Sequence, residues 1–410
     1  MKSIRAIAAA ALSCILVACG GGGEAAPAPP PGGGGPPQLP DPATAPALKT
    51  VIANAFGTAN FPVGAAIGTA STTGADATLL TRHFSGITAE SVMKPDTIKG
   101  VSEAQAYNFV PADQLAAFAQ ANNMRLRGHA LLWHQTAPAW FFAGDQSNAV
   151  LYRSLVRNRL RTYIIDVVTH FGAQVYAWDV VNEVASDTQN AANPYRTASP
   201  WYQAYSVGGL NGADYVADAF IFANEARASL GLTPTSMKLI LNDYNTELPG
   251  KRANVIQIVQ SLITQAVPID GVGHQFHLQL GVSAADITAA LNATQNLGVV
   301  LDNHVTELDV SIYADPGSCF SSRTIPPCLA DYGANPPQSV LSQQATLYRA
   351  LFSAFRRPDV TSITFWGFAD SRTWLNSFPV NRTNRPLLFD TSLNPKWAFW
   401  TVVDPTIVVP

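Results

Sequence analysis

The stretch VYAWDVVNE, residues 175–183, has the character of a buried β-strand that carries polar side chains to its own end. It is rich in valine and aromatic residues, which are typical of strands. One acid, Asp179, lies in its middle, and the stretch closes on Asn182 and a second acid, Glu183. A charge in an apolar run is costly unless it is paired or put to use. We expect Asp179 to be a buried partner within the fold, with no catalytic role, and the last two residues to reach a functional site.

Seven further apolar runs of this kind occur along the chain, with amphipathic stretches such as 150–172, 213–231 and 338–355 between them. The runs are FPVGAAI (61–67), HFSGITAE (83–90), MRLRGHALLW (124–133), MKLILNDYN (237–245), IDGVGHQFH (269–277), DNHVTELDV (302–310) and VTSITFWGF (360–368). A strand followed by a helix, eight times, predicts an α/β protein with a single (β/α)8 TIM barrel.

Polar and aromatic residues gather toward the C-terminal ends of these eight runs. They are Glu90, His129, Trp133, Asn182, Glu183, Asn242, Asp243, Gln275, His277, Glu307, Asp309 and Trp366. In a barrel these ends converge on one face, which is where the active sites of this fold lie. The distribution therefore predicts an active site rather than a protein built only for packing.

Glu183 and Glu307 end matched motifs on the fourth and seventh runs, so we expect them to face each other across the barrel mouth. Two facing carboxyl groups, one protonated and one ionised, are what glycoside hydrolysis requires. Asn182 could hydrogen-bond a sugar hydroxyl. His277, oriented by Asp309, could keep Glu307 ionised. For any single glutamate the alternative is a salt bridge or a helix cap.

Composition and spacing exclude several other functions. The net charge is −3 without a basic stripe, so we expect no nucleic-acid partner. Histidines occur in pairs at 274/277 and 129/134, but the first run lacks histidine and no H-E-x-x-H occurs, and the cysteines 319 and 328 have no further ligands close by, so we expect no metal. No glycine-rich phosphate loop joins a strand to a helix, so we expect no cofactor.

The first 47 residues are organised as an export signal and a spacer. A basic start and the apolar stretch AIAAAALSCILVA indicate a signal peptide over residues 1–19. It ends in LVAC, which resembles a bacterial lipobox with Cys19 as the lipidated residue; ordinary signal cleavage nearby is the alternative. Residues 20–47 form a Gly/Pro-rich linker, and residues 48–405 the catalytic barrel. We expect an outer-membrane or cell-surface lipoprotein, or otherwise a secreted or periplasmic protein.

Cys319 and Cys328 are the remaining cysteines of the exported chain, and they lie in a Pro-, Ser- and Gly-rich stretch. In an oxidising compartment they predict a local disulfide, with two free thiols as the alternative. The loop 315–337 that contains them either shapes the leaving-group side of the site or is a stapled surface insertion. No heptad or exposed repeat suggests assembly, so we expect a monomer.

Nine motifs, taken in order, resemble those of glycoside hydrolase family 10, the endo-xylanase barrel family, over about Leu48 to Val403. The motifs are ESVMKPD (90–96), RGHALLWHQTAPAW (127–140), WDVVNEV (178–184), LNDYN (241–245), GVGHQFH (271–277), VTELDV (305–310), FWGFADSRTWL (365–375), PLLFD (386–390) and NPKWAF (394–399). The resemblance implies an endo-1,4-β-xylanase that cleaves xylan or xylo-oligosaccharides with retention of configuration.

The same resemblance assigns roles within the site. It implies that Glu183 is the general acid/base, that Glu307 is the nucleophile, and that Asn182 holds the hydroxyl at carbon 2 of the sugar. The other implied positions are the glycon side (Glu90, Lys94, His129), the neighbours of the nucleophile (Gln275, His277), the apolar walls (Trp133, Trp366, Trp374) and the leaving-group side (Tyr244, Asn245).

Two departures from the family pattern fall in the second glycon subsite. Ser91 follows Glu90 where the family usually has asparagine. Gln135 and Thr136 stand where it usually has serine and glutamine. The shorter side chains at positions 91 and 136 predict a roomier subsite and an altered glycon preference. They keep open the alternative of a β-1,4-glucanase or a mixed xylanase/glucanase. The alternative from another class of protein is a non-catalytic glycan-binding surface lipoprotein. The presence of both catalytic glutamates argues against it.

Overall fold

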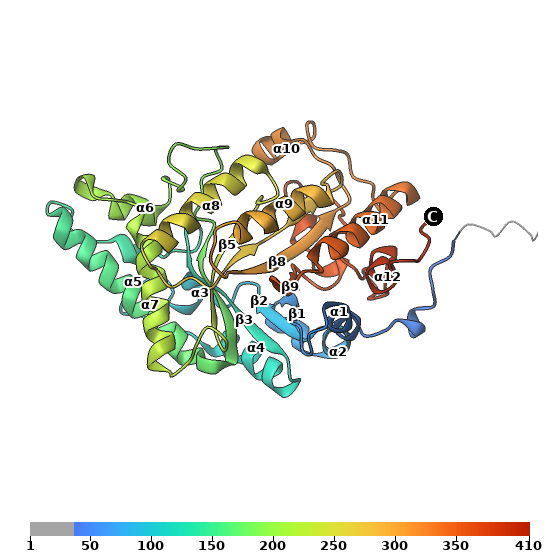
Figure 1. Cartoon of the computed structure of the whole chain (residues 1–410), viewed down its shortest axis with the longest axis horizontal. Coiled ribbons are helices and arrows are strands. Elements are labelled where there is room, and N and C mark those ends of the chain that lie inside the picture. The colour runs from blue at the N-terminus through green and yellow to red at the C-terminus, as the bar shows by residue number, and fades with distance from the viewer. Residues whose placement is uncertain (1–36) are drawn as a thin grey trace, which may run out of the picture. The chain divides into compact units, whose positions relative to one another are not determined.

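A computed structural model describes residues 37–410 of the chain. The expected signal peptide, Cys19 and the linker up to residue 36 lie outside the described residues. Residues 38–410 form one compact unit (Figure 1).

Eight parallel strands form a closed ring. Each pairs with its neighbour along the chain, the last pairs with the first, and the sixth pairs with the strand after the short β7 (His277–Gln279). The strands of the ring are β1 (Val63–Ile67), β2 (Gly86–Ala89), β3 (Arg125–Trp133), β4 (Val175–Asn182), β5 (Lys238–Asp243), β6 (Gly271–His274), β8 (Asp302–Ser311) and β9 (Val360–Phe365). The predicted (β/α)8 barrel is confirmed, and each of the eight runs contains one strand of the ring.

The sixth run differs from the prediction, because it contains β6 and the beginning of β7. The strand is interrupted at Gln275 and Phe276, and Phe276 has a left-handed backbone with a φ of 51°. It then resumes at His277, which pairs with Asp309 on β8. The interruption brings the His277 side chain next to the acids of β8.

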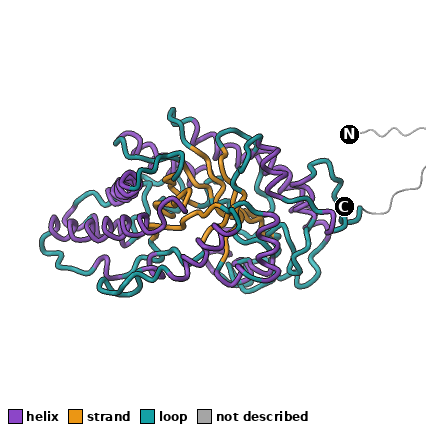
Figure 2. The backbone as a smooth tube through the Cα atoms, turned by 90° about the horizontal axis from the view of Figure 1, so that it is seen from below, coloured by secondary structure: helices purple, strands orange, loops and turns teal. Residues whose placement is uncertain are grey.

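A helix follows each strand of the ring, and the helices surround the strands, as Figure 2 shows. They are α2 (Gly74–His83), α4 (Val110–Ala121), α5 (Ala149–Phe171), α7 (Asp214–Ser229), α8 (Pro249–Thr264), α9 (Ala284–Gln295), α11 (Gln338–Phe355) and α12 (Trp397–Val403). The additional helices are α1 (Leu48–Phe56), α3 (Pro95–Ile98), α6 (Pro200–Tyr205) and α10 (Gly317–Ser322). None of the described helices is long and apolar enough to cross a bilayer.

Local signals in the sequence explain where several helices begin. A capping box between Ser283 and Asp286 starts α9, and the Asn148 side chain caps α5. Pro249 stands at the first position of α8, where its missing N–H costs nothing. These signals set the first residues of the three helices.

The interior of the ring is packed and partly ionic. A Cβ on Gly128 would come within 2.2 Å of the Trp178 ring, so only glycine fits between the two strands. Asp179 is buried, as expected, and accepts hydrogen bonds from Arg127, whose Nε lies at 3.3 Å, and from His129, whose Nδ1 lies at 2.9 Å. It therefore orients His129 at the barrel mouth.

Candidate active site

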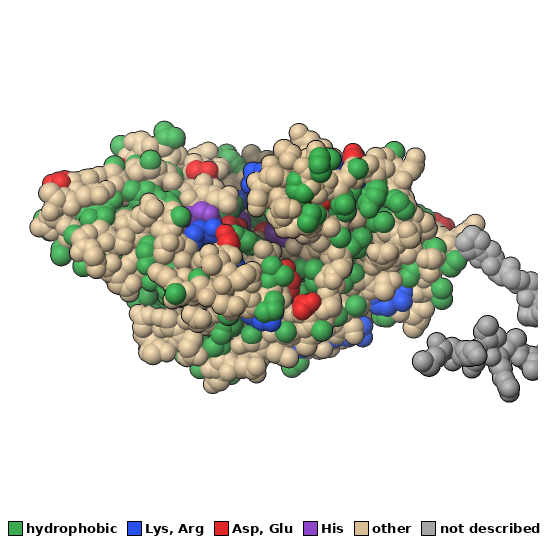
Figure 3. Space-filling view, turned by 90° about the horizontal axis from the view of Figure 1, so that it is seen from above, with side chains coloured by type: hydrophobic (Ala, Val, Ile, Leu, Met, Phe, Trp, Pro, Cys, Tyr) green, Lys and Arg blue, Asp and Glu red, His purple; other side chains and the backbone are tan. Residues whose placement is uncertain are grey.

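One face of the molecule is hollowed near its middle, and acidic, basic and histidine side chains gather there (Figure 3). At the carboxyl end of β4, Glu183 has a left-handed backbone with a φ of 58°. Its carboxyl group accepts hydrogen bonds from Trp133 Nε1 at 2.9 Å and Gln275 Nε2 at 3.3 Å. Burial, reinforced by the charge of Asp243, raises the pKa of Glu183 above its usual range. Glu183 is therefore disposed to hold a proton.

Glu307 on β8 lies in the opposite electrostatic situation. Its carboxylate accepts hydrogen bonds from Asn242 Nδ2 at 2.8 Å and His277 Nε2 at 3.0 Å, and His129 Nδ1 lies 4.0 Å away. Burial alone would raise the pKa of Glu307, but the hydrogen bond from His277 and the two histidines outweigh it and lower the pKa. Glu307 is thus held as an anion.

His277 bridges two acids. Its Nδ1 lies 2.9 Å from Asp309 Oδ2, which also accepts a hydrogen bond from Trp374 Nε1 at 2.9 Å. Burial opposes the charge on His277, yet Asp309 and Glu307 together raise its pKa to about 10. A His277 cation can donate to both carboxylates at once, so it fixes the orientation of Glu307.

Three amide side chains connect the two glutamates. Asn242 Nδ2 donates to Asn182 Oδ1 at 2.9 Å as well as to Glu307, and Gln275 Nε2 donates to Asn182 at 3.2 Å as well as to Glu183. Asn242 in turn accepts a hydrogen bond from Thr306 Oγ1 at 2.6 Å. Asn242 and Thr306 received no role from the sequence, although Asn242 already stood among the polar residues at the strand ends.

Glu90 and Lys94, which the resemblance assigns to the glycon side, differ in their electrostatic surroundings. Lys94 Nζ lies 4.7 Å from the centre of the Trp133 ring, and burial lowers the pKa of Lys94. Glu90, at the end of β2, has its pKa raised by burial. The charge of Glu307 raises the pKa of both Glu90 and Lys94, although for Lys94 burial outweighs it.

Trp366 and Trp374 form aromatic walls around the histidines. The Trp366 ring packs edge-on against His129, with centroids 5.1 Å apart, and Trp374 packs against His277 at 4.9 Å. Aromatic faces of this kind suit the apolar faces of sugar rings.

On the remaining side, Tyr244 donates its hydroxyl proton to Asp187 at 2.5 Å and accepts a hydrogen bond from Arg196 Nη2 at 2.8 Å. Asn245 follows with a φ of 56°, and its carbonyl accepts the N–H of Leu248. No pattern in the sequence indicated that Tyr244 bonds to Asp187 and Arg196, because both partners come from the irregular segment after β4.

A disulfide joins Cys319 and Cys328 in the loop after β8. Together with Asp315 these cysteines form the one metal-like grouping of His, Cys, Asp and Glu atoms among residues 37–410. Both sulfur atoms are used in the disulfide, and Asp315 is paired with Arg382. The grouping is therefore a structural brace, and its atoms are not free to act as ligands.

A closed parallel barrel whose carboxyl end carries two networked carboxyl groups, one with a raised pKa and one with a lowered pKa, is the arrangement that glycoside hydrolysis requires. Residues 48–405 match the sequence profile of glycosyl hydrolase family 10. The chain belongs to this family.

Named relatives and solved structures agree with this assignment. The chain is 37% identical to the "Thermostable celloxylanase" of Thermoclostridium stercorarium, over 84% of this chain and 85% of the relative. It is 35% identical to "Endo-1,4-beta-xylanase A" of Halalkalibacterium halodurans, over 84% of each chain. The crystal structure of xylanase B from Clostridium stercorarium F9 superposes with a TM-score of 0.76 at 37% identity, covering 88% of this chain and 100% of that one.

Proposed function

We propose that the protein is an endo-1,4-β-xylanase that hydrolyses internal bonds of xylan or xylo-oligosaccharides by a retaining double displacement. The observation that carries the proposal is the hydrogen-bonded network that joins Glu183 and Glu307, whose surroundings shift the two pKa values in opposite directions, upward for Glu183 and downward for Glu307. The xylanase names of the relatives identify the sugar class.

The first step forms a covalent sugar–enzyme intermediate. The Glu307 carboxylate attacks the anomeric carbon while Glu183 gives its proton to the leaving glycosidic oxygen, so the bond breaks without release of an alkoxide. Asn182, held by Asn242 and Gln275, is placed to bind the hydroxyl at carbon 2, and the tryptophan walls to hold the ring.

The second step releases the sugar. Glu183, now ionised, takes a proton from a water molecule whose oxygen attacks the anomeric carbon, and Glu307 leaves as a carboxylate. Two inversions give net retention. No step requires a metal or an organic cofactor.

The test is the release of reducing sugar from xylan, with the anomeric configuration of the first product followed by NMR. Wild type is expected to release β-anomers, and Glu307→Ala to lose essentially all activity while unfolding at the wild-type temperature. Full activity of folded Glu307→Ala, or α-anomers as first product, would overturn the proposal.

A mixed xylanase/glucanase is the second candidate. Ser91 and Gln135 are exposed, and the Thr136 hydroxyl is buried without a hydrogen-bond partner among the described residues. A relative in Acetivibrio thermocellus, 34% identical, is named "Exoglucanase XynX". Product profiles on linear xylotriose and xylotetraose, branched xylo-oligosaccharides, glucuronoxylan, arabinoxylan and cellulose decide the matter. A strict preference for linear xylan would exclude the roomier subsite.

The export route belongs to the proposal as well. The lipobox-like LVAC supports a lipoprotein anchored through Cys19, with the Gly/Pro-rich segment as the spacer between the anchor and the barrel. The absence of heptads and exposed repeats supports a monomer. Cys19→Ala is expected to move the enzyme from the membrane fraction to the soluble fraction of the native host or a bacterial host with lipoprotein processing. An unchanged distribution would contradict the anchor.

A further inference from the structure

The backbone that carries the acid/base is held by neighbouring segments. A φ of 58° at Glu183 is a strained conformation for a residue with a Cβ, so surrounding contacts must maintain it. The Glu183 N–H donates to Asn242 O at 2.9 Å, and its carbonyl accepts from Arg196 Nε at 2.9 Å. Two residues on, Ala185 donates its N–H to Asp243 and accepts a hydrogen bond from Lys251 Nζ at 2.8 Å.

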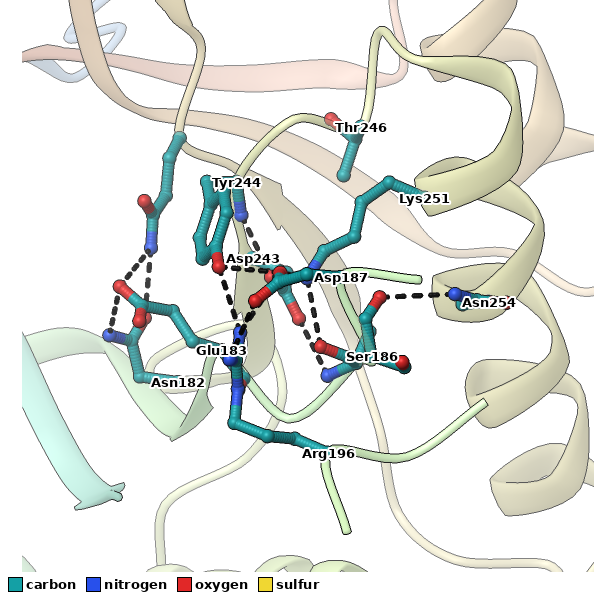
Figure 4. A network of polar contacts seen from close by, with 12 residues as sticks. Asn182, Glu183, Ser186, Asp187, Arg196, Asp243, Tyr244, Thr246, Lys251 and Asn254 are labelled. Carbon is teal, nitrogen blue, oxygen red and sulfur yellow. Dashed lines mark hydrogen bonds and ion pairs between the residues drawn. The ribbon is translucent and has the colours of Figure 1, made fainter. Parts of the chain in front are cut away.

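The two cationic side chains that hold this backbone segment, Arg196 and Lys251, both donate to the carboxylate of Asp187 (Figure 4). Asp187 accepts from Arg196 Nη1 at 2.7 Å and Nη2 at 3.1 Å, and from Lys251 Nζ at 3.0 Å. The Tyr244 hydroxyl on the leaving-group side donates to the same carboxylate at 2.5 Å. Although burial opposes ionisation, these donors lower the pKa of Asp187 to about 2, so it is charged in the working range of pH.

The exposure of Asp187 argues against a role in stability alone. Its side chain is 50% exposed, whereas that of Lys251 is 1% exposed. Ion pairs with an exposed partner contribute only ~0–1 kcal/mol to folding. The geometric effect is larger, because a bidentate carboxylate fixes the plane of the Arg196 guanidinium and hence the direction of its Nε toward the Glu183 carbonyl.

We propose that Asp187 is a positioning residue that orients Arg196 and Lys251 so that they hold the left-handed backbone of Glu183, and that ties this conformation to Tyr244 on the leaving-group side. The inference rests on the proposed function, since it concerns proton donation by Glu183. On this proposal, the loop after β4 orients the Glu183 carboxyl group toward the leaving oxygen.

The test compares leaving groups that differ in their need for a proton. Asp187→Asn keeps the size of the side chain but removes its charge and one acceptor. For phenyl β-xylobioside, which needs acid assistance, kcat/KM is expected to fall about tenfold, a fraction of the 10²–10⁴ that general acid catalysis supplies. For 2,4-dinitrophenyl β-xylobioside, whose leaving group departs as a stable anion, kcat/KM is expected to stay within about threefold.

A matched control lies on the outer helices. Asp214 on α7 pairs with Arg153 on α5, and its side chain is 36% exposed. Asp214→Asn removes the same charge from a similar pair without touching the site, so both substrates are expected to react at wild-type rates. Glu183→Ala serves as the reference for complete loss of the acid, with the same selectivity and a larger defect.

The outcomes separate this inference from the proposed function. Equal losses on both substrates, or wild-type rates on both, would overturn the role of Asp187 while a selective defect in Glu183→Ala still supports the enzyme. If Glu183→Ala shows no selective defect, the proposed function itself fails. If Asp187→Asn does not fold, Arg196→Lys is measured in the same way. Lysine keeps the positive charge but cannot bind the Asp187 carboxylate with two parallel N–H groups, so the same selective loss is expected.

Discussion

At the scale of single residues, the surroundings of Glu183 and Glu307 shift their pKa values in opposite directions. Glu183 is buried near Asp243, and Glu307 faces the His277 cation. Activity requires a protonated Glu183 and an ionised Glu307. The rate therefore falls in acid as Glu307 gains a proton and falls in base as Glu183 loses one, which gives a bell-shaped pH profile.

Replacing His277 tests the acidic side of this profile. His277→Asn removes the positive charge that lowers the pKa of Glu307, so this pKa rises and the acidic limb of kcat/KM moves to higher pH, by about one unit as an order of magnitude. The basic limb, which Glu183 sets, is expected to stay in place. An acidic limb at its wild-type position would show that His277 does not govern Glu307.

At the scale of elements, the close approach of β5 and β6 fixes the amide network. A Cβ on Gly273 would come within 2.4 Å of Asn242 Oδ1, and Asn242 is already bonded to Glu307 and Thr306. Gly273→Ala must displace it. A displacement of about 1 Å near the reacting groups can cost about 10² in rate, so kcat/KM on xylan is expected to fall by about that factor. A folded Gly273→Ala variant that reacts at the wild-type rate would contradict this role of Asn242.

The disulfide loop reaches the site through aromatic rings. Phe320 on α10 packs against Phe378, with ring centroids 5.9 Å apart, and Phe378 stacks on Trp374 at 4.8 Å. These contacts connect the loop to the Trp374 wall of the site, and Cys319 and Cys328 also brace the surface. That the loop shapes the leaving-group side stays a prediction.

Opening the loop should therefore weaken substrate binding. Cys319→Ala/Cys328→Ala removes a short crosslink whose loop-closure contribution is about 2–3 kcal/mol. The variant is expected to be cut faster by proteases in the loop and to show a KM for xylan raised by about threefold, with kcat maintained, since less than 1 kcal/mol of binding is lost. Phe320→Ala, with the disulfide intact, should raise KM similarly. Unchanged KM in both variants would leave the loop as a surface brace only.

At the scale of the whole molecule, the barrel and the position of its site could be predicted from the sequence, because apolar runs and the residues at their ends are local features. Three features could not be predicted in this way: the left-handed backbone at Glu183, the interruption between β6 and β7, and the hydrogen bonds from Arg196, Lys251 and Tyr244 to Asp187. They depend on backbone angles and on side chains from the loop after β4, from β5 and from α8, which meet only in the folded chain. Strand order likewise says which residues lie at the mouth but not which amide donates to which carboxylate.

The left-handed backbone of Glu183 makes the stability of the fold and the catalytic activity compete at this position. Glycine adopts this conformation freely, whereas a Cβ costs about 1–2 kcal/mol there. Glu183→Gly and Glu183→Ala both abolish acid catalysis, yet the glycine variant is expected to unfold at the higher urea concentration, which reverses the usual ranking of the two residues outside turns. An alanine variant as stable as the glycine variant would show that the turn stores no strain. If the glycine variant is the more stable one, selection for stability alone favours loss of the acid/base. The glycine variant would then serve as a stable protein that binds oligosaccharides without cleaving them.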